Sequence, residues 1–290
     1  MRVLIIGSDG MLGHILSRYL QTNTEHEVFN LSRKIRIKAD NYFSCDISDE
    51  KLLMRIFKKV NPDIIINCVG ILIKGSNNSI KNAIYVNSYF PHFLVEISNK
   101  LNFKVIHIST DCVFSGSTGS YSEDSIKDAK DTYGLTKSLG EINSSRHLTI
   151  RTSIIGPELK TNGEGLFNWL FKQDGEISGY SRVIWSGVTT LELAKVILFS
   201  INNDIYGLWN VSSPEPISKY ELLIKIKNQF SLTNIRINNN AKLSLNKSLI
   251  SKRKINYIVP SYDVMINELF DYIHLNKQLY NSYLNESKST

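Results

Sequence analysis

"VLIIGSDGMLG" (residues 3–13) joins a short apolar run to a helix-like stretch, and the glycines Gly7, Gly10 and Gly13 lie between the two. Glycines at such positions allow a tight turn and let a pyrophosphate approach the backbone N–H groups at a helix N-terminus. The spacing is G-x-x-G-x-x-G, whereas many dehydrogenases have G-x-G-x-x-G. Because a strand is expected before the glycines and a helix after them, we predict a nucleotide site rather than a plain turn.

The first half of the chain alternates short apolar runs with amphipathic stretches. The runs are rich in Ile and Val and are bounded by turn residues, as strands are. We expect strands at 2–7, 26–32, 41–47, 63–70 and 103–110, with helices at 11–20, 48–60 and near 79–100. This alternation indicates an α/β fold of the Rossmann type, which is a doubly wound parallel sheet with helices on both faces.

The second half is less regular. After "HLTIRTSIIG" (147–156) come glycine-containing loops, and a further loop is expected over the Asn-rich residues 238–248. Helices are expected at 189–201, near 217–230 and at 261–273, with a strand at 207–213. We predict an NADP-binding domain over 1–150 and a smaller C-terminal α/β substrate-binding domain over 151–290, some of whose segments return to the first domain.

The composition is that of an ordinary globular protein, with 290 residues of which 42% are hydrophobic. The longest mainly apolar stretch, residues 64–73, is about half the length of a membrane-spanning helix. The apolar run near the N-terminus meets glycine and aspartate too early for a signal peptide. We therefore expect a cytoplasmic protein without a membrane partner.

Metals and nucleic acids are not favoured as partners. The three cysteines lie far apart in the sequence, and the six histidines show no metal-ligand spacing. The formal net charge of +7 is spread along the chain instead of being gathered in a basic arm. Such a distribution is typical of a solvated basic surface.

The end of the second expected strand bears on the choice of cofactor. An NAD site usually has Asp or Glu there to hold the ribose 2′-OH, but "FNLSRKIR" (29–36) contains Arg33, Lys34 and Arg36 and no acid. A guanidinium matches a 2′-phosphate well, so the sequence favours NADPH, with NADH as the alternative cofactor. The basic residues would otherwise line a solvated turn.

Two further segments contain candidate catalytic groups. "ISTDCVFSG" (108–116) ends a strand with Ser109 and Thr110, and "DTYGLTK" (131–137) places Tyr133 and Lys137 on one helix face. Chance alone predicts about one Tyr-x-x-x-Lys pair in a chain of this composition, so the pair is informative only together with its context. Hydride reduction of a ketone needs a proton donor at its oxygen, and an ammonium beside a tyrosine is expected to lower the phenol pKa.

Together these motifs resemble the extended short-chain dehydrogenase/reductases, and most closely the dTDP-4-dehydrorhamnose reductase family of sugar-nucleotide reductases. The likeness rests on the glycine loop, "STDCVFSG" (109–116) and "YGLTKSLGE" (133–141), and it extends to "RTSIIGPE" (151–158), "GVTTLELAKVI" (187–197) and "PSYDVMINEL" (260–269). It implies Tyr133 as general acid, Lys137 as its partner and ribose ligand, and Thr110 as the hydroxyl that orients the keto oxygen.

The resemblance also implies a cofactor site. Pyrophosphate contacts fall on the glycine loop, the 2′-phosphate contact on Arg33, and the adenine contacts on Asp46 and Ile47. The remaining wall of the cofactor site comprises Asn67, Cys68, Val69, Gly70, Asn87 and Ser109, and the loop contacts are Gly7, Gly10, Met11, Leu12 and Gly13. Asn67 and Asn87 would alternatively be caps or turn residues.

Expected substrate contacts come mainly from the second half of the chain. They are Val113, Phe114, Asn168, Arg182 and Trp185. Arg182 suits a diphosphate and Trp185 a base or sugar, although both residue types are as often plain packing. "WSGVTTLE" (185–192) departs from the family, which commonly has an acidic pair before this stretch and a proline in place of Val188. The identity of the sugar and of its nucleotide is therefore open.

Four functions remain under consideration. The first is NADPH-dependent reduction at C4 of a nucleotide-linked 4-keto-6-deoxy sugar for polysaccharide synthesis, and the second is the same chemistry on a UDP-linked N-acetylated sugar. An epimerase or dehydratase ranks low because no glutamate follows Asp111. A non-catalytic NADP-binding regulatory subunit is the alternative of another class. The sequence leaves a homodimer open.

Overall fold

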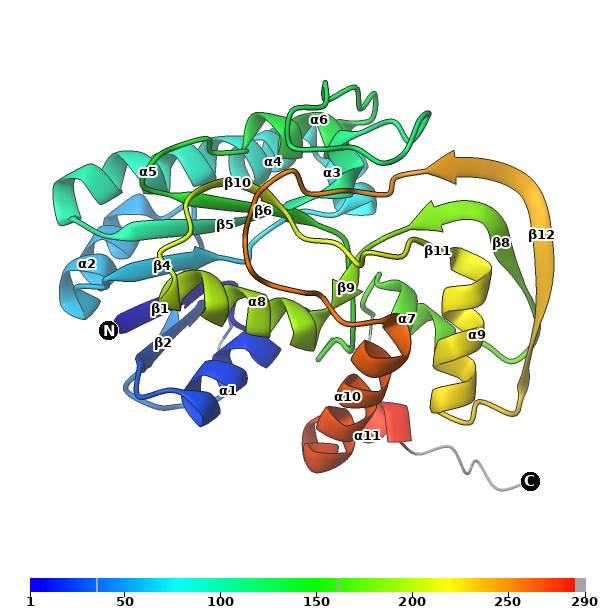
Figure 1. Ribbon diagram of the computed structural model, residues 1–290. Helices are drawn as coiled ribbons and strands as arrows, with labels where there is room; N and C mark the ends of the chain where they lie inside the picture. The colour runs from blue at the N-terminus through cyan, green and yellow to red at the C-terminus, as the bar shows by residue number, and fades with distance from the viewer. Residues whose placement is uncertain (35, 161, 285–290) are drawn as a thin grey trace.

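Seven parallel strands form the central sheet within residues 1–34, 36–160 and 162–284, which the computed structural model describes (Figure 1). Their order across the sheet is β10-β6-β5-β4-β1-β2-β3, the doubly wound order in which β1 lies between β4 and β2. The α/β fold predicted from the sequence is confirmed. The strands are β1 (Arg2–Ile6), β2 (Glu27–Ser32), β3 (Tyr42–Ser44), β4 (Ile64–Asn67), β5 (Lys104–Thr110), β6 (Leu148–Thr152) and β10 (Gly207–Asn210).

Side chains of the central strands pack against helices on both faces. In β1, Val3 and Ile5 belong to one hydrophobic core, whereas Leu4 and Ile6 belong to the other. Alternate residues of a strand point to opposite faces, which explains the division. The first core includes side chains of α1 (Gly13–Asn23) and α8 (Thr190–Asn202), and the second includes side chains of α2 (Glu50–Val60) and α5 (Phe90–Leu101). Figure 1 shows these two pairs of helices on opposite faces of the sheet.

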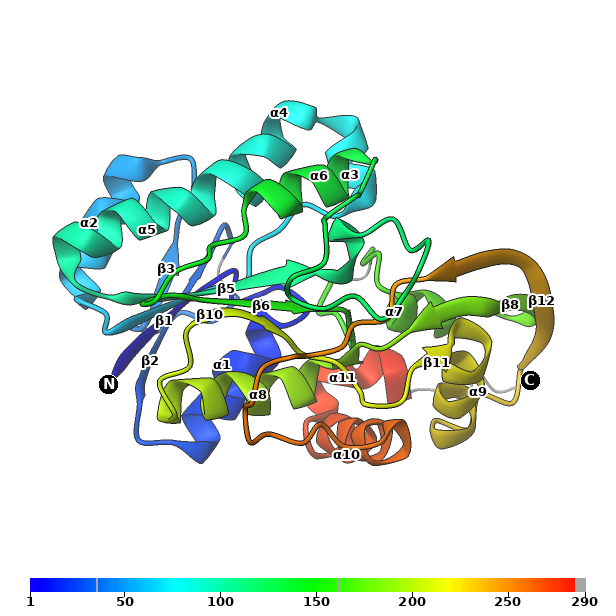
Figure 2. The same cartoon turned by 45° about the horizontal axis from the view of Figure 1, so that its top comes forward.

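Short helical segments lie between β4 and β6 on the side of α5 (Figure 2). The helix predicted near 79–100 is a series of pieces in which η1 is π-helical, and π-helical turns often occur at functional sites. α6 packs against η1 and against the end of β5. The segments are α3 (Ile73–Asn78), α4 (Ile80–Ala83), η1 (Ile84–Tyr89), η2 (Asp111–Val113) and α6 (Thr132–Leu139).

The second half of the chain builds a smaller sheet with the order β11-β8-β12, and α9 packs on it. Strand β10, also from the second half of the chain, pairs with β6 at the edge of the central sheet. The predicted strand at 207–213 therefore joins the sheet of the first half. The division at residue 150 stays a prediction. The other elements are β7 (Ile154–Ile155), α7 (Leu166–Leu170), β8 (Gly175–Trp185), β9 (Val188–Thr189), β11 (Ile217–Ser218), α9 (Lys219–Gln229), β12 (Ile235–Asn246), α10 (Tyr262–Leu275) and α11 (Lys277–Leu284).

The prediction of a loop over residues 238–248 was wrong. Residues up to Asn246 continue β12, which pairs in parallel with β8 from Ile235 to Asn246 with an irregularity between Asn240 and Ser244. Asparagine has a low strand propensity, but β12 is an edge strand with many exposed side chains. Main-chain pairing with β8 therefore outweighs local preference. No helix in the described part of the chain is long and apolar enough to cross a membrane.

Gly13→Ala tests how closely α1 packs on the glycine loop. A Cβ at residue 13 would lie 2.2 Å from the Gly7 carbonyl oxygen, which is backbone and cannot swing away. We expect the free energy of unfolding, measured by urea titration, to fall by about 1–3 kcal/mol. The control Gly70→Ala adds a Cβ at 3.7 Å from Asn87 Oδ1 and should change it by less than about 0.5 kcal/mol. Equal stabilities of the two variants would contradict this packing.

Candidate active site

Three neighbouring strands end side by side and bring the predicted site residues together. β1 pairs with β4 so that Ile6 lies beside Asn67, and β4 pairs with β5 so that Asn67 lies beside His107. The chain leaves these strands through the glycine loop, through residues 68–70 and through Thr110, the last residue of β5. Because ligands bind beyond the carboxyl ends of parallel strands, this edge of the sheet is the candidate active site.

The glycine loop fits a pyrophosphate. Gly7 has a φ of +87°, and a side chain at this residue would also meet Val69 Cγ2 at 3.1 Å. Gly10 donates its N–H to the Gly7 carbonyl at 2.9 Å, which closes the turn. No side chain caps α1, whose N-cap is Leu12. The N–H groups of an uncapped first turn favour an anion, so the predicted contacts are compatible with a dinucleotide.

The predicted adenine side lies at the ends of β2 and β3. Arg33 is exposed, and its carbonyl accepts a hydrogen bond from the Ser44 hydroxyl at 3.0 Å. Hydrogen bonds from the Ser48 N–H and hydroxyl lower the pKa of Asp46, and the charge of Arg33 adds to this effect. Ile47 is buried. Contacts of these residues with a cofactor stay predictions.

Lys137 is the buried cation of the site. Its ammonium donates to the Ile108 carbonyl at 2.7 Å and lies 3.5 Å from His107 Nε2. The Asp131 side chain caps α6 by accepting a hydrogen bond from the Gly134 N–H. The helix therefore begins at Thr132, and Tyr133 lies in its first turn. Burial lowers the pKa of Lys137 to about 8, although the negative charge of Glu141 acts in the opposite direction.

Tyr133 lies on α6 one turn before Lys137 and is also buried. The structure differs from the expectation that Lys137 lowers the phenol pKa. Burial raises the pKa of Tyr133 above its ordinary value, Cys112 raises it further, and hydrogen bonding with Thr110 opposes the rise. The reason is that burial is the largest influence on this phenol, and it outweighs any stabilisation of the phenolate by the Lys137 charge. A tyrosine in this environment holds its proton at neutral pH, as a proton donor must.

His107 and Glu141 were not recognised in the sequence. His107 is fully buried in β5, where it resembled one more core position, and its Nδ1 lies 3.1 Å from Asn67 Nδ2. Burial and the charge of Lys137 hold the pKa of His107 well below its usual value, so the ring is neutral. Glu141 accepts the Ser109 hydroxyl at 2.7 Å and forms a buried ion pair with Arg151 at 2.8 Å. A polar residue inside an apolar strand was the available signal for His107.

Asn87 holds the wall of the site together from η1. Its Oδ1 accepts the Ile71 N–H at 2.9 Å, and its Nδ2 donates to the Ile71 carbonyl at 3.0 Å and to Thr136 Oγ1 at 3.1 Å. These bonds tie the segment after β4 to α6. Burial raises the pKa of the neighbouring Cys68 to about 12, so this cysteine is a neutral thiol.

The predicted substrate contacts lie on several elements of the fold. Val113 and Phe114 are fully buried in a small core with Tyr121 and Leu249. Asn168 donates to the Gly163 carbonyl at 2.8 Å and accepts the Tyr283 hydroxyl at 3.2 Å. Arg182 is exposed on β8, whereas Trp185 is buried with the Lys219 ammonium 4.5 Å above its ring. Their roles in binding stay predictions.

A cleft beside Tyr133 offers another set of lining residues. α3 and the residue before it provide one wall, and Glu164 provides another. These positions gave no signal in the sequence, because no motif covers them. The lining residues are Leu72, Ile73, Lys74, Asn77, Asn78, Tyr133 and Glu164.

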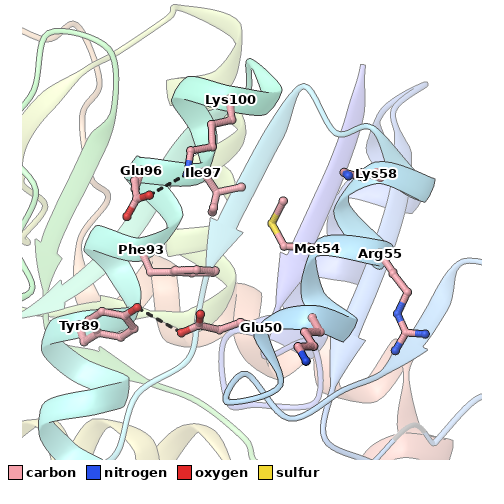
Figure 3. Close-up of a pocket in the computed structure, with 10 residues that line it drawn as sticks. Glu50, Met54, Arg55, Lys58, Tyr89, Phe93, Glu96, Ile97 and Lys100 are labelled. Atoms are coloured by element: carbon pink, nitrogen blue, oxygen red, sulfur yellow. Dashed lines mark hydrogen bonds and ion pairs between the residues drawn. The ribbon is translucent and has the colours of Figure 1, made fainter.

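A second groove lies between α2 and α5, away from these residues (Figure 3). It is crossed by a hydrogen bond from the Tyr89 hydroxyl to Glu50 Oε1 at 3.2 Å and contains none of the predicted site residues. Among residues 1–34, 36–160 and 162–284, no three His, Cys, Asp or Glu side chains are arranged to hold a metal ion.

The family model described as the RmlD substrate binding domain matches residues 1–248. The chain belongs to this family. The match runs from β1 through the glycine loop, β5 and α6 into the smaller sheet, so it contains every predicted site residue. The resemblance inferred from the motifs is thereby confirmed.

Relatives of this RmlD-family chain have different names. The spore coat polysaccharide biosynthesis protein SpsK of Bacillus subtilis is 27% identical over 237 residues, which cover 80% of each chain. A dTDP-4-dehydrorhamnose reductase of Aggregatibacter actinomycetemcomitans is 25% identical over 237 residues, or 78% of each chain. The methionine adenosyltransferase 2 subunit beta of Bos taurus is 25% identical over 251 residues, which cover 80% of this chain and 72% of that protein.

Among solved structures, a hypothetical dTDP-4-dehydrorhamnose reductase from Sulfolobus tokodaii has a TM-score of 0.75 and 27% identity. The alignment covers 91% of this chain and 98% of that one. The likeness over nearly the whole of both chains confirms the Rossmann-type architecture for this member of the RmlD family.

Lys137→Met tests the buried ammonium through the pH dependence of stability. The lysine pKa is about 8 when folded and about 10.4 when unfolded, so the unfolded chain binds more protons between these values. Wild-type stability should therefore gain more than about 1 kcal/mol relative to Lys137→Met between pH 7 and pH 10. Urea unfolding at both pH values measures this gain.

The exposed Lys81→Met is the matched control, because Lys81 lies on the surface of α4. Its stability should follow the wild type at both pH values. Parallel pH profiles for wild type and Lys137→Met would show that Lys137 is not held in a buried, desolvated state.

Proposed function

We propose that this protein reduces the C4 keto group of a nucleotide-linked 4-keto-6-deoxy sugar with NADPH, in the synthesis of a surface polysaccharide. The observation that carries the proposal is the placement of Thr110 beside Tyr133, which lines a cleft, with the Lys137 ammonium buried one turn further along the same helix. Membership of the RmlD family and the name of the Aggregatibacter reductase support the same chemistry.

Different residues of the site have different roles in the proposed carbonyl reduction. The glycine loop and the uncapped start of α1 would hold the pyrophosphate of the dinucleotide, and Arg33 its 2′-phosphate. NADPH supplies the hydride when it is bound. Tyr133 donates a hydrogen bond to the keto oxygen, where negative charge develops as the carbonyl is reduced. The Thr110 hydroxyl, which donates to Asp111 Oδ1 at 3.1 Å, would turn to donate to the same oxygen.

Proton transfer falls to Tyr133, because burial keeps its phenol protonated before the reaction. The phenolate that remains is stabilised by the positive charge of Lys137. Neutral His107 and Asn67 lie behind Lys137 and orient it without adding a competing charge. The groups needed for an acid-assisted hydride transfer are thus supplied by one helix and one strand end.

We infer a dTDP-linked substrate first, because the Aggregatibacter relative is a dTDP-4-dehydrorhamnose reductase. A UDP-linked N-acetylated sugar is the alternative within the same chemistry. A regulatory subunit that binds NADP without turnover is the second candidate function, and the observation that favours it is the likeness to a methionine adenosyltransferase subunit.

NADPH oxidation, followed at the nicotinamide absorbance band with dTDP- and UDP-linked 4-keto-6-deoxy sugars, tests the proposal. We expect consumption with one of the two nucleotides and a loss of about 10²–10⁴-fold in kcat for Tyr133→Phe, since the proton donor is removed. The control Tyr206→Phe removes the hydroxyl of an exposed tyrosine and should keep full activity.

Tight NADPH binding without consumption of either sugar would contradict a reductase and favour the regulatory subunit. If the wild type reduces a sugar and Tyr133→Phe keeps full activity, the protein is a reductase but the proton comes from another group.

A further inference from the structure

The glycine loop is fastened to the end of β2, the strand beside β1 in Figure 1. Both the Gly7 and the Ser8 N–H groups donate to the Leu31 carbonyl, at 2.8 and 3.2 Å. The next residue of the loop is Asp9 and the next residue of β2 is Ser32. The Ser32 hydroxyl lies 3.2 Å from Asp9 Oδ2 and 2.9 Å from the Lys34 carbonyl oxygen, so its one hydrogen is shared between these two acceptors.

This contact places the Asp9 carboxylate at the end of β2, where the strand itself has no acidic residue. In Rossmann sites the adenosine ribose lies at the end of β2, and an acid there accepts hydrogen bonds from the ribose hydroxyls of NADH. The last residue of β2 is Ser32, and the residues after it are basic. Asp9 reaches the same point from the glycine loop, so an acid is present although the end of β2 lacks one.

The same carboxylate faces a basic residue of the following turn. Arg36 Nε lies 3.9 Å from Asp9 Oδ2, and Arg36 Nη2 donates to the Leu159 carbonyl at 3.0 Å. Burial raises the pKa of Asp9, whereas the Ser32 hydroxyl and the charges of Arg36 and Lys160 lower it. The Arg36 side chain is 50% exposed, so the ion pair is screened by water and weak.

We propose that Asp9 determines dinucleotide choice and lets the site accept NADH as well as NADPH. With NADH, the Asp9 carboxylate accepts the adenosine ribose hydroxyls. With NADPH, the 2′-phosphate meets the same carboxylate, and Arg36 compensates by turning from Asp9 to the phosphate. The inference rests on the dinucleotide site of the proposed function and on no step of the sugar chemistry.

Fluorescence titration of the whole protein with NADPH and with NADH, without any sugar, tests this role. In the wild type we expect the two dissociation constants to lie within about tenfold of each other. Asp9→Asn should weaken NADH by about tenfold and tighten NADPH several-fold, because a charged acceptor is lost and a repulsion is removed. Arg36→Gln should weaken NADPH more than NADH.

Asp40→Asn is the matched control, since it removes one negative charge from an exposed position of the same turn. It should leave the ratio of the two dissociation constants unchanged. If Asp9→Asn lowers the melting temperature strongly, Ser32→Ala takes its place: without the hydroxyl that orients Asp9, NADH should weaken relative to NADPH.

Three results would overturn the inference. The first is that Asp9→Asn and Asp40→Asn have the same ratio of NADH to NADPH dissociation constants. The second is that the wild type binds NADPH but not NADH. Both of these results would leave the proposed reductase intact. Binding of neither dinucleotide would overturn the inference and the proposed function together.

Discussion

The hydrogen bond from the Lys137 ammonium to the Ile108 carbonyl is the interaction on which the site depends. A buried ammonium needs a partner, and this one ties α6 to the carboxyl end of β5. Because Tyr133 precedes Lys137 by one helical turn, the same bond places the phenol beside Thr110, the last residue of β5. Asn67 of β4 and His107 of β5 pack behind the lysine, so two neighbouring strands hold one cation.

A second constraint acts at the carboxyl ends of β1 and β2, where the glycine loop bonds to the end of β2. Close packing of Gly13 on Gly7 sets the start of α1, and the fastened loop sets the position of Asp9. The dinucleotide would therefore lie between two fixed ends: an anion site at α1 and a reducing site at α6. Under the two proposals, dinucleotide choice and carbonyl chemistry would depend on different residues, so each could change without the other.

Sequence patterns predicted those elements whose structure depends mainly on residues close together in the chain. The strand, glycine loop and first helix were predicted from one continuous stretch, and so were the end of β5 and the helix that carries Tyr133. β12 was missed because its asparagines form a strand only through pairing with β8. The contacts of Asp9 with Ser32 and of His107 with Lys137 join residues 23 and 30 positions apart, and no spacing rule anticipates such contacts. Burial of Tyr133, which sets the direction of its pKa shift, also depends on tertiary packing.

The measurement that tests the account most directly is the fate of the hydride. NADPH deuterated at the transferable position of the nicotinamide is turned over with the dTDP-linked 4-keto-6-deoxy sugar, and the product is analysed by NMR. The account predicts deuterium at C4 of the sugar and at no other carbon. A product without deuterium, or with deuterium at another carbon, would contradict C4 carbonyl reduction by the Thr110, Tyr133 and Lys137 site.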